Sequence, residues 1–456
     1  MQICVIKAGS AIVTQDNNML DLNTIQNICH QIIKLSTKGW RIILVSSGAV
    51  ACGKGSIEAS QDIIKKHKSY ADSILASLGQ GKLIYYYSSF LNTNSSSLDV
   101  GQILVNRVSL SFRENYTNLK KIILGMLDSN IVPIINENDA LGLKGMNFLD
   151  NDQLASIITI MVRAKACLLL SDVGAVYTKN PKLYKDAKKL SEIDINNANI
   201  EIDDSNSSRG GMKSKIDVFK LMSRFGIQCI LSGKKDISLL CDIVDGTIIK
   251  GTRLKPNKEK RYSITKEWLG TGAIPKGMVL ISSAGADVMA GRTEKNSKSN
   301  LYSIGICGYL GNFDKGEIVS VRDEQLNLIG IGKSKCSSSD LQARNYGSVF
   351  IHENDFFQLS SYSFIDLDMI NIKSTLKQLR KRLLSHDDER FIIAPISADI
   401  DLKTTKIEEE SIVINREKVK KFLSMFKYAK LHFSLTFDEW LIYCALEGFY
   451  EKEMQL

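Results

Sequence analysis

The sequence predicts an α/β protein: a mainly parallel sheet between layers of helices, then a small β-rich domain and an α-rich C-terminal extension. In the first half, apolar runs of the fully buried type, such as residues 41–46, alternate with segments of helical spacing, such as residues 23–38. This alternation is typical of a parallel sheet covered on both faces. From residue 274 the apolar runs become shorter, rich in β-branched side chains and interrupted by glycine, which indicates a barrel or half-barrel.

The individual elements follow from local patterns. The expected strands of the first domain cover residues 3–6, 41–46, 131–135, 167–170 and 227–231. In the helix between the first two strands, we expect Asn23 to be the N-cap and Gly39 to end the helix. In the extension, a helical stripe over residues 372–383 and a capping box at residues 436–439 predict two helices.

A polar, charged stretch near residues 255–261 interrupts the pattern and indicates a linker. The predicted organisation is therefore a first domain over residues 1–254, a linker over 255–273, a β-rich domain over 274–359 and an extension of unknown role over 360–456.

Composition restricts the class of protein. The chain has 456 residues, of which 44% are hydrophobic and 24% charged, as in soluble proteins of two or three domains. It has neither an apolar run of the roughly 18 residues that cross a membrane nor a secretory signal at its start. The nine cysteines include no Cys-x-x-Cys pair, so we expect reduced thiols, a cytoplasmic location and no bound metal in a Cys or His site. The net charge of +9 lies mostly in short runs that favour solvated surfaces over a nucleic-acid site.

Polar residues follow four of the expected strands. The carboxyl ends of parallel strands share one edge, and ligands bind in the crevice outside it. The residues expected at this edge are Lys7, Gly9, Ser10, Ser47, Asn136, Asp139, Ser171 and Asp172. Each segment alone is weak support for a site, because polar residues usually follow strands, but together they predict one.

Two further segments belong with this edge. Asp150, Asn151 and Asp152 stand at an expected helix start, where acidic residues are equally often simple partners of the helix dipole. In residues 210–215, paired glycines allow backbone N–H groups to approach a phosphate, and Lys215 adds a positive charge, although a flexible turn has the same composition. Residues 48–55 nearly match a P-loop, but Gly55 replaces the required hydroxyl and the stretch favours a helix start.

These motifs resemble, in the same order, those of the glutamate 5-kinases, which have the amino-acid kinase fold and an appended PUA domain. The matching segments are residues 7–10, 46–49, 78–80, 100–102, 134–139, 150–152 and 210–215, together with Arg113, Tyr116 and Asn118. Residues 308–317 and 347–352 resemble the PUA domain, so that the likeness covers roughly residues 1–359. The chain departs from the family at Leu149, where glycine is usual, at Arg209, where threonine is usual, and in a shortened segment between residues 340 and 347.

The resemblance implies transfer of phosphate from ATP to the side chain of L-glutamate, the first step of proline biosynthesis. Matching positions assign glutamate binding to Ser47, Asp139 and Asn151, with Asn136 and Asp150 nearby. They assign ATP binding to Lys7, Gly9, Ser10, Ser171, Asp172, Gly210, Gly211, Met212, Lys213, Ser214 and Lys215. Lys7 and Lys215 would neutralise the transferring group, and Asp152 would orient both lysines. Mg²⁺ would accompany ATP, held mainly by phosphates and water, and a dimer or tetramer is the family expectation.

Two alternatives stay open from the sequence. One is a related kinase for another small acid, such as aspartate or N-acetylglutamate, or for a nucleotide, although the acidic residues 136–139 disfavour a nucleotide. The other is an RNA-binding PUA protein with a vestigial kinase domain, which the lack of clustered aromatic residues interleaved with arginine disfavours.

Overall fold

The computed structural model divides the chain into two compact units, Met1–Gly272 and Ala273–Leu456. The structure describes residues 2–15, 19–55, 60–68, 70–92, 98–141, 150–181, 183–194, 212–256, 262–289, 300–310, 312–323, 328–342, 348–359, 390–393, 406–408 and 411–415. Leu149, Arg209, Gly210 and Gly211 lie outside these residues, as do the helices predicted at 372–383 and 436–439.

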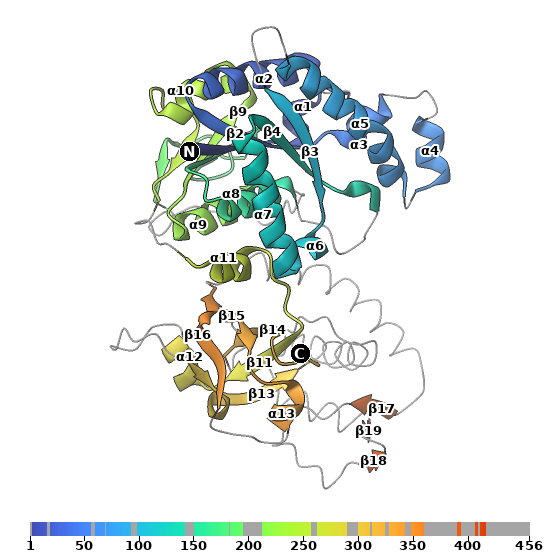
Figure 1. Cartoon of the computed structure of the whole chain (residues 1–456), viewed down its shortest axis with the longest axis vertical. Helices are drawn as coiled ribbons and strands as arrows, with labels where there is room; N and C mark the ends of the chain where they lie inside the picture. Colours follow the sequence, from blue (N-terminus) through green and yellow to red (C-terminus); the bar gives the residue numbers. More distant parts are fainter. Residues whose placement is uncertain are drawn as a thin grey trace. The chain divides into compact units, whose positions relative to one another are not determined.

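An eight-stranded sheet in the order β3-β4-β2-β1-β5-β9-β10-β8 forms the centre of the first unit (Figure 1). Its strands are β1 (Gln2–Ala8), β2 (Trp40–Ser46), β3 (Asp99–Val105), β4 (Ile131–Glu137), β5 (Ala166–Ser171), β8 (Glu192–Ile193), β9 (Gln228–Gly233) and β10 (Thr252–Leu254). All pairs are parallel except β9 with β10. The predicted parallel α/β sheet is therefore confirmed.

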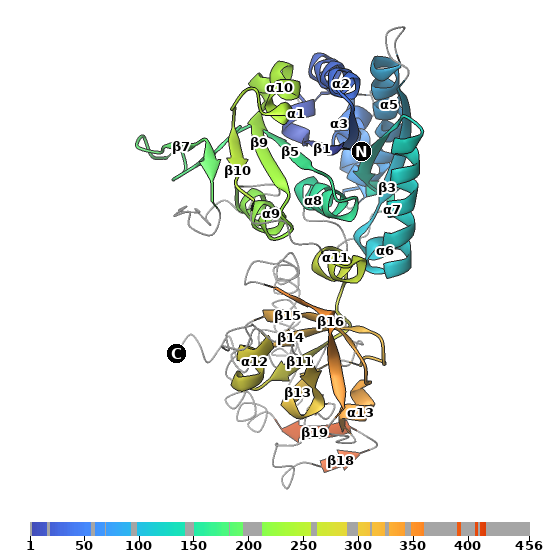
Figure 2. The same cartoon turned by 60° about the vertical axis from the view of Figure 1, so that its left-hand side comes forward.

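Helices cover both faces of this sheet (Figure 2). They are α1 (Ser10–Val13), α2 (Leu22–Thr37), α3 (Ala49–Lys54), α4 (Ser60–Lys66), α5 (Ala71–Leu91), α6 (Arg107–Ser111), α7 (Arg113–Asp128), α8 (Asn151–Met161), α9 (Met212–Arg224), α10 (Leu240–Asp245) and α11 (Ile264–Thr271). Cys4, Ile6 and Ala8 of β1 belong to a core that also contains α2, α5 and α10. Because successive side chains of a strand alternate between faces, Ile3, Val5 and Lys7 point to the opposite side, where α8 packs.

The strands expected from the sequence occur within a few residues of their predicted positions. The helix predicted from Asn23 begins instead at Leu22, because the side chain of Asp21 accepts the N–H of Thr24 at 3.0 Å and is the N-cap. Residues 49–54, which nearly match a P-loop, form helix α3, as the sequence predicts. The segment expected as a linker contains α11, which packs against α7 and α8 of the first unit.

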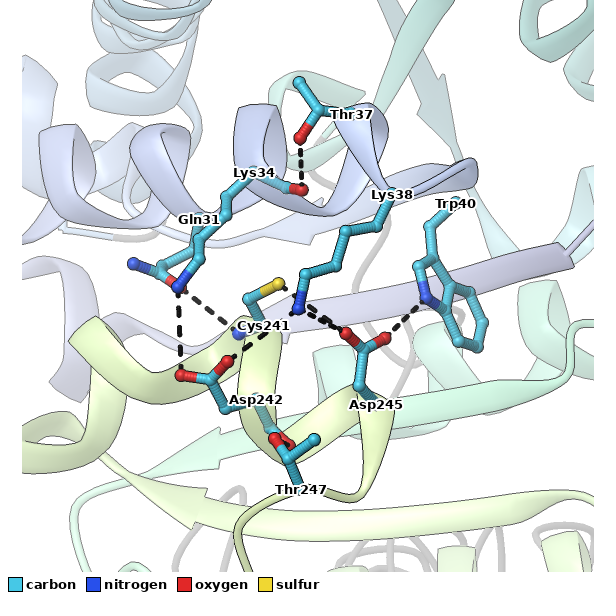
Figure 3. A network of polar contacts seen from close by, with 9 residues as sticks. All are labelled: Gln31, Lys34, Thr37, Lys38, Trp40, Cys241, Asp242, Asp245 and Thr247. Atoms are coloured by element: carbon cyan, nitrogen blue, oxygen red, sulfur yellow. Dashed lines mark hydrogen bonds and ion pairs between the residues drawn. The ribbon is translucent and has the colours of Figure 1, made fainter.

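A network of polar contacts joins α2 to α10 at the amino end of β2 (Figure 3). Asp245 accepts from Lys38 Nζ at 2.6 Å and from Trp40 Nε1 at 2.9 Å. The side-chain carbonyl of Gln31 accepts the backbone N–H of Cys241 at 3.2 Å. These contacts lie at the opposite end of β2 from Ser46 and stabilise the packing of α10 against α2.

The second unit contains a six-stranded sheet in the order β12-β16-β15-β14-β11-β13. Its elements are β11 (Gly277–Ile281), α12 (Ser283–Met289), β12 (Leu301–Tyr302), β13 (Ile306–Leu310), β14 (Ile318–Arg322), β15 (Leu328–Ser334), α13 (Ser338–Gln342) and β16 (Val349–Gln358). Gly330 lies so close to β16 that a Cβ atom would be 2.5 Å from the carbonyl oxygen of Phe357. The predicted β-rich domain is confirmed.

The described part of the extension adds three strands that the sequence analysis does not predict. They are β17 (Arg390–Ile393), β18 (Lys406–Glu408) and β19 (Ser411–Asn415), and they form an antiparallel sheet in the order β17-β19-β18. None of the helices in the described ranges combines the length and apolar character needed to span a bilayer.

Candidate active site

The carboxyl ends of β4, β2, β1 and β5 lie side by side, because these four strands are neighbours in the parallel sheet. The polar segments that follow them therefore meet at one edge, as the sequence predicts. Lys7, the next-to-last residue of β1, points toward α8 and reaches the first turn of that helix.

Asp152 in the first turn of α8 joins two lysines. Its side chain is fully buried; one oxygen lies 2.5 Å from Nζ of Lys7 and the other lies 3.0 Å from Nζ of Lys215. Lys215 comes from the first turn of α9, which packs against α8. Burial by itself would raise the pKa of Asp152, but the two ammonium groups outweigh it and hold that pKa below its ordinary value.

This buried group carries a formal charge of +1, from two ammonium groups and one carboxylate. Both ammonium groups lie at the edge where ligands bind in parallel sheets, and lysine is a common point charge for binding phosphate, so the arrangement suits an anionic ligand. Asp152 neutralises part of the charge and holds both Nζ atoms at the carboxyl edge of the sheet.

Asp150, the N-cap of α8, links the starts of two helices. One of its oxygens accepts the backbone N–H of Gln153 at 3.0 Å, and the other accepts the hydroxyl of Ser214 in α9 at 2.6 Å. Together with the contact between Asp152 and Lys215, this bond aligns the first turns of α8 and α9. The acidic pair at the helix start therefore does more than complement the helix dipole.

Three side-chain amides, those of Asn151, Asn136 and Gln80, form a chain of hydrogen bonds at this edge, called the amide chain below. Asn151 Nδ2 donates to Ser47 Oγ at 2.6 Å and to Asn136 Oδ1 at 3.1 Å. Asn136 Oδ1 also accepts the backbone N–H of Glu137 at 2.9 Å, and Asn136 Nδ2 donates to Gln80 Oε1 at 3.0 Å. Ser47, Asn151 and Asn136, which the resemblance assigns to glutamate binding, are thus in direct contact.

The remaining predicted residues lie at the same edge or outside the described chain. Gly9 follows β1 so closely that a Cβ atom there would be 2.6 Å from Nζ of Lys7. Ser10 begins α1, and the hydroxyl of Ser171, at the end of β5, donates to Asp172 at 3.0 Å. Asp139 opens a short 3-10 helix, η1 (Asp139–Leu141), that packs against α5.

The loop predicted to hold phosphate is described only in part. Met212 is the first residue of α9, and Lys213 follows it in the helix. Gly210 and Gly211 lie outside the described residues.

Gln80 is a polar residue that the sequence analysis did not assign to the site. It lies on α5 between Ala76 and Leu83, in line with the residues that pack on the sheet, and it contacts Asn136 directly. The signal that could have identified it is an amide side chain at helical spacing within an apolar stripe.

Comparison with known families agrees with the division of the chain. Residues 2–231 match the model of the amino acid kinase family, and residues 284–350 match the PUA domain. The glutamate 5-kinase of Oceanobacillus iheyensis is 30% identical over 347 residues, which are 75% of this chain and 90% of that protein. The glutamate 5-kinase of Bacteroides thetaiotaomicron is 31% identical over 348 residues, which are 74% of this chain and 92% of that protein.

Among solved structures, a carbamate kinase from Giardia lamblia bound to AMP-PNP is similar with a TM-score of 0.44 and 17% identity, over 56% of this chain and 99% of that one. A UMP kinase from Bacillus anthracis is similar with a TM-score of 0.40 and 16% identity, over 56% of this chain and 95% of that one. The family match and the curated relatives show that the chain belongs to the amino acid kinase family and, within it, to the glutamate 5-kinases.

Proposed function

We propose that the chain transfers the γ-phosphoryl group of ATP to the side-chain carboxylate of L-glutamate, giving L-glutamyl 5-phosphate and ADP, the first step of proline biosynthesis. The observation that carries this proposal is the buried carboxylate of Asp152 between the ammonium groups of Lys7 and Lys215. Both lysines stand at the edge of the sheet where ligands bind in open α/β folds.

The chemistry needs little more than this arrangement. The nucleophile is a carboxylate, which is already ionised at neutral pH, so the reaction requires no general base. Phosphoryl transfer depends on in-line positioning and on positive charge around the equatorial oxygens of the transferring group. In the proposal, Lys7 and Lys215 supply that charge, while Asp152 keeps the two Nζ atoms in place.

The substrate is placed by the amide chain and the acidic residues. Ser47 and Asn151 would bind the glutamate side chain near the lysines, with Asn136 further along. Asp139 and Asp150 would attract the α-ammonium group. Gly9, Ser10, Ser171, Asp172 and the segment from Gly210 to Lys215 would hold the phosphates and the rest of ATP.

Mg²⁺ is part of the proposal as a companion of ATP. The oxygens of Asp152 face two ammonium groups, and those of Asp150 accept from Ser214 and a backbone N–H, so these carboxylates are engaged within the protein. This donor set fits an ion held largely by phosphates and water, since Mg²⁺ keeps several of its waters and binds substrate phosphates. When bound, the ion would neutralise charge on ATP.

A coupled ADP-release assay tests the proposal with glutamate, aspartate, N-acetylglutamate and UMP as acceptors, and with hydroxylamine to trap acyl phosphate. We expect ADP and a hydroxamate with glutamate. An ADP signal with another acceptor and no hydroxamate from glutamate would overturn the substrate assignment.

We further infer that the protein works in the cytoplasm as a homo-oligomer, a dimer or tetramer. The eight cysteines in the described residues are not joined in disulfides, and this fits a cytoplasmic location. Light scattering coupled to size-exclusion chromatography measures the oligomeric state. A salt-dependent gel shift with RNA, using the full chain, tests RNA binding by the PUA domain, which we do not expect.

A further inference from the structure

One buried hydrogen-bond donor at the site is not used by any contact described so far. It is Gln80 Nε2: this atom is buried, and among the residues that the structure describes none accepts a hydrogen bond from it. A buried amide donor without a partner is unfavourable, because it has lost its hydrogen bond to water. An acceptor that arrives with a ligand would remove this cost.

The backbone determines which way this amide points. The N–H of Glu137 donates to Asn136 at 2.9 Å, so the atom of Asn136 that it meets must be the carbonyl oxygen. The NH₂ group of Asn136 therefore faces Gln80, whose carbonyl oxygen accepts from it at 3.0 Å. A flipped Gln80 would place two donors against each other. The NH₂ group of Gln80 therefore points away from Asn136, because the carbonyl oxygen of Gln80 is the atom that contacts Asn136.

The position of Gln80 is also fixed by helix packing. The neighbouring Gly79 lies so close to α3 that a Cβ atom would be 1.9 Å from the carbonyl oxygen of Ala49. This close crossing holds α5 against the helix that follows Ser47. Leu83 and Tyr87, one and two turns further along α5, are fully buried in the core, and Gln80 is half-buried on the same side of the helix.

The order of contacts along the edge indicates which part of the ligand would meet Gln80. The amide chain runs from Asn151, next to Asp152, through Asn136 to Gln80. Gln80 is therefore the last residue of this chain of hydrogen bonds, counted from the residue next to Asp152. If the carboxylate that accepts phosphate lies beside the lysines, the other end of the same molecule lies toward Gln80.

We propose that Gln80 is a specificity-determining residue whose Nε2 donates a hydrogen bond to the α-carboxylate of the amino-acid substrate. This inference rests on the proposed function. It makes Gln80 select for a substrate with a carboxylate at both ends, since an N–H donor to an anion forms a stronger bond than one to a neutral amide.

Gln80→Glu tests the proposal with little change in shape. The introduced carboxylate still accepts from Asn136, but it has lost the donor and repels an α-carboxylate. Isoglutamine, in which the α-carboxylate is a carboxamide and the acceptor carboxylate is unchanged, can donate to the new side chain. We expect the KM for glutamate to rise by about tenfold or more, while the ratio of kcat/KM for isoglutamine to that for glutamate rises by at least about tenfold.

Two further variants complete the test. Gln26→Glu adds the same charge to an exposed position of α2 and should leave the ratio unchanged. Gln80→Met removes both polar atoms at similar length and should raise the KM for glutamate without favouring isoglutamine as Gln80→Glu does. The KM for ATP should change by less than about twofold in all three, because the bond is to the other substrate.

The possible outcomes separate this inference from the proposed function. If the unmodified protein forms no hydroxamate from glutamate, the function itself is wrong. If it does, but Gln80→Glu lowers kcat/KM for glutamate and isoglutamine by the same factor, Gln80 acts through the structure of the site and the proposal is overturned. An unchanged KM for glutamate in a folded Gln80→Glu protein also overturns it.

Discussion

Replacing Lys215 by alanine removes one of the two ammonium groups beside Asp152 while leaving the other in place. In the intact protein, two lysines and one carboxylate give this buried group a formal charge of +1. In the variant, Lys7 and Asp152 remain paired at 2.5 Å and the charge becomes zero. The fold therefore keeps a neutral pair, whereas the site loses the charge that would act on the phosphoryl group.

The expected effect on turnover is large. A unit charge at about 4 Å from another contributes roughly 4 kcal/mol at an effective dielectric constant of about 20. Part of this attraction already exists when ATP is bound, so the part specific to the transition state is smaller. Loss of one preorganised donor to a developing charge commonly lowers kcat by about 10²- to 10³-fold. We expect a loss in this range for Lys215→Ala, with the KM for glutamate changed less than about threefold.

ADP release at saturating ATP measures kcat, and a glutamate titration measures KM. Lys121→Ala, which removes an exposed lysine of α7, is the matched control and should retain full activity. Thermal unfolding of both variants should show that Lys215→Ala is folded. A folded Lys215→Ala protein that keeps more than a tenth of the normal kcat would refute the role assigned to this lysine.

The other predictions concern the surroundings of these groups. Asp152→Asn should lower the free energy of unfolding at pH 7 by about 3–5 kcal/mol, because it leaves two buried ammonium groups without their partner. Folding lowers the pKa of Asp152, so its contribution to the free energy of unfolding is present above about pH 4 and is lost as the pH falls through the folded-state pKa. Urea unfolding should therefore show a smaller difference in that free energy between the unmodified protein and Asp152→Asn at pH 3 than at pH 7. Gly9→Ala should displace Lys7 Nζ, the flexible end of a side chain, and lower kcat by about tenfold or more with little change in melting temperature. A large fall in melting temperature together with the fall in kcat would contradict this prediction. Asp245→Ala should lower the melting temperature through loss of the bond to Trp40, at about 1 kcal/mol, while kcat stays unchanged, because this contact lies about 20 Å from the site along β2.

Most of the sheet could be predicted because its central strands are buried on both faces and are therefore apolar throughout. Three strands of this sheet, β3, β8 and β10, escaped prediction for physical reasons. β3 is an edge strand, and its mixture of exposed and half-buried residues removes the apolar signal. β8 has two residues and β10 has three, too few for any periodicity. β10 pairs with both β9 and β8.

The candidate site could be predicted as a region but not as a set of contacts. Parallel topology alone brings Lys7 and Asn136 to one edge. The contact of Lys215 with Asp152 depends on α9 packing beside α8, and no local pattern specifies that packing across 63 residues. Gln80 escaped assignment because its role depends on a hydrogen bond to Asn136, 56 residues away, and on its own NH₂ group, which has no partner among the described residues.

The arrangement of charges also explains why one carboxylate should separate two lysines at a site for phosphate. Without Asp152, the two ammonium groups would repel each other, and two buried charges would have no carboxylate to compensate them. With it, each Nζ atom is held by a different oxygen of the same side chain, at 2.5 and 3.0 Å, while the group keeps one positive charge. Both Nζ atoms are thereby held in fixed positions at the carboxyl edge of the sheet. Preorganised charge of this kind stabilises a transition state more effectively than solvent, because no reorganisation is needed when the phosphoryl group is transferred.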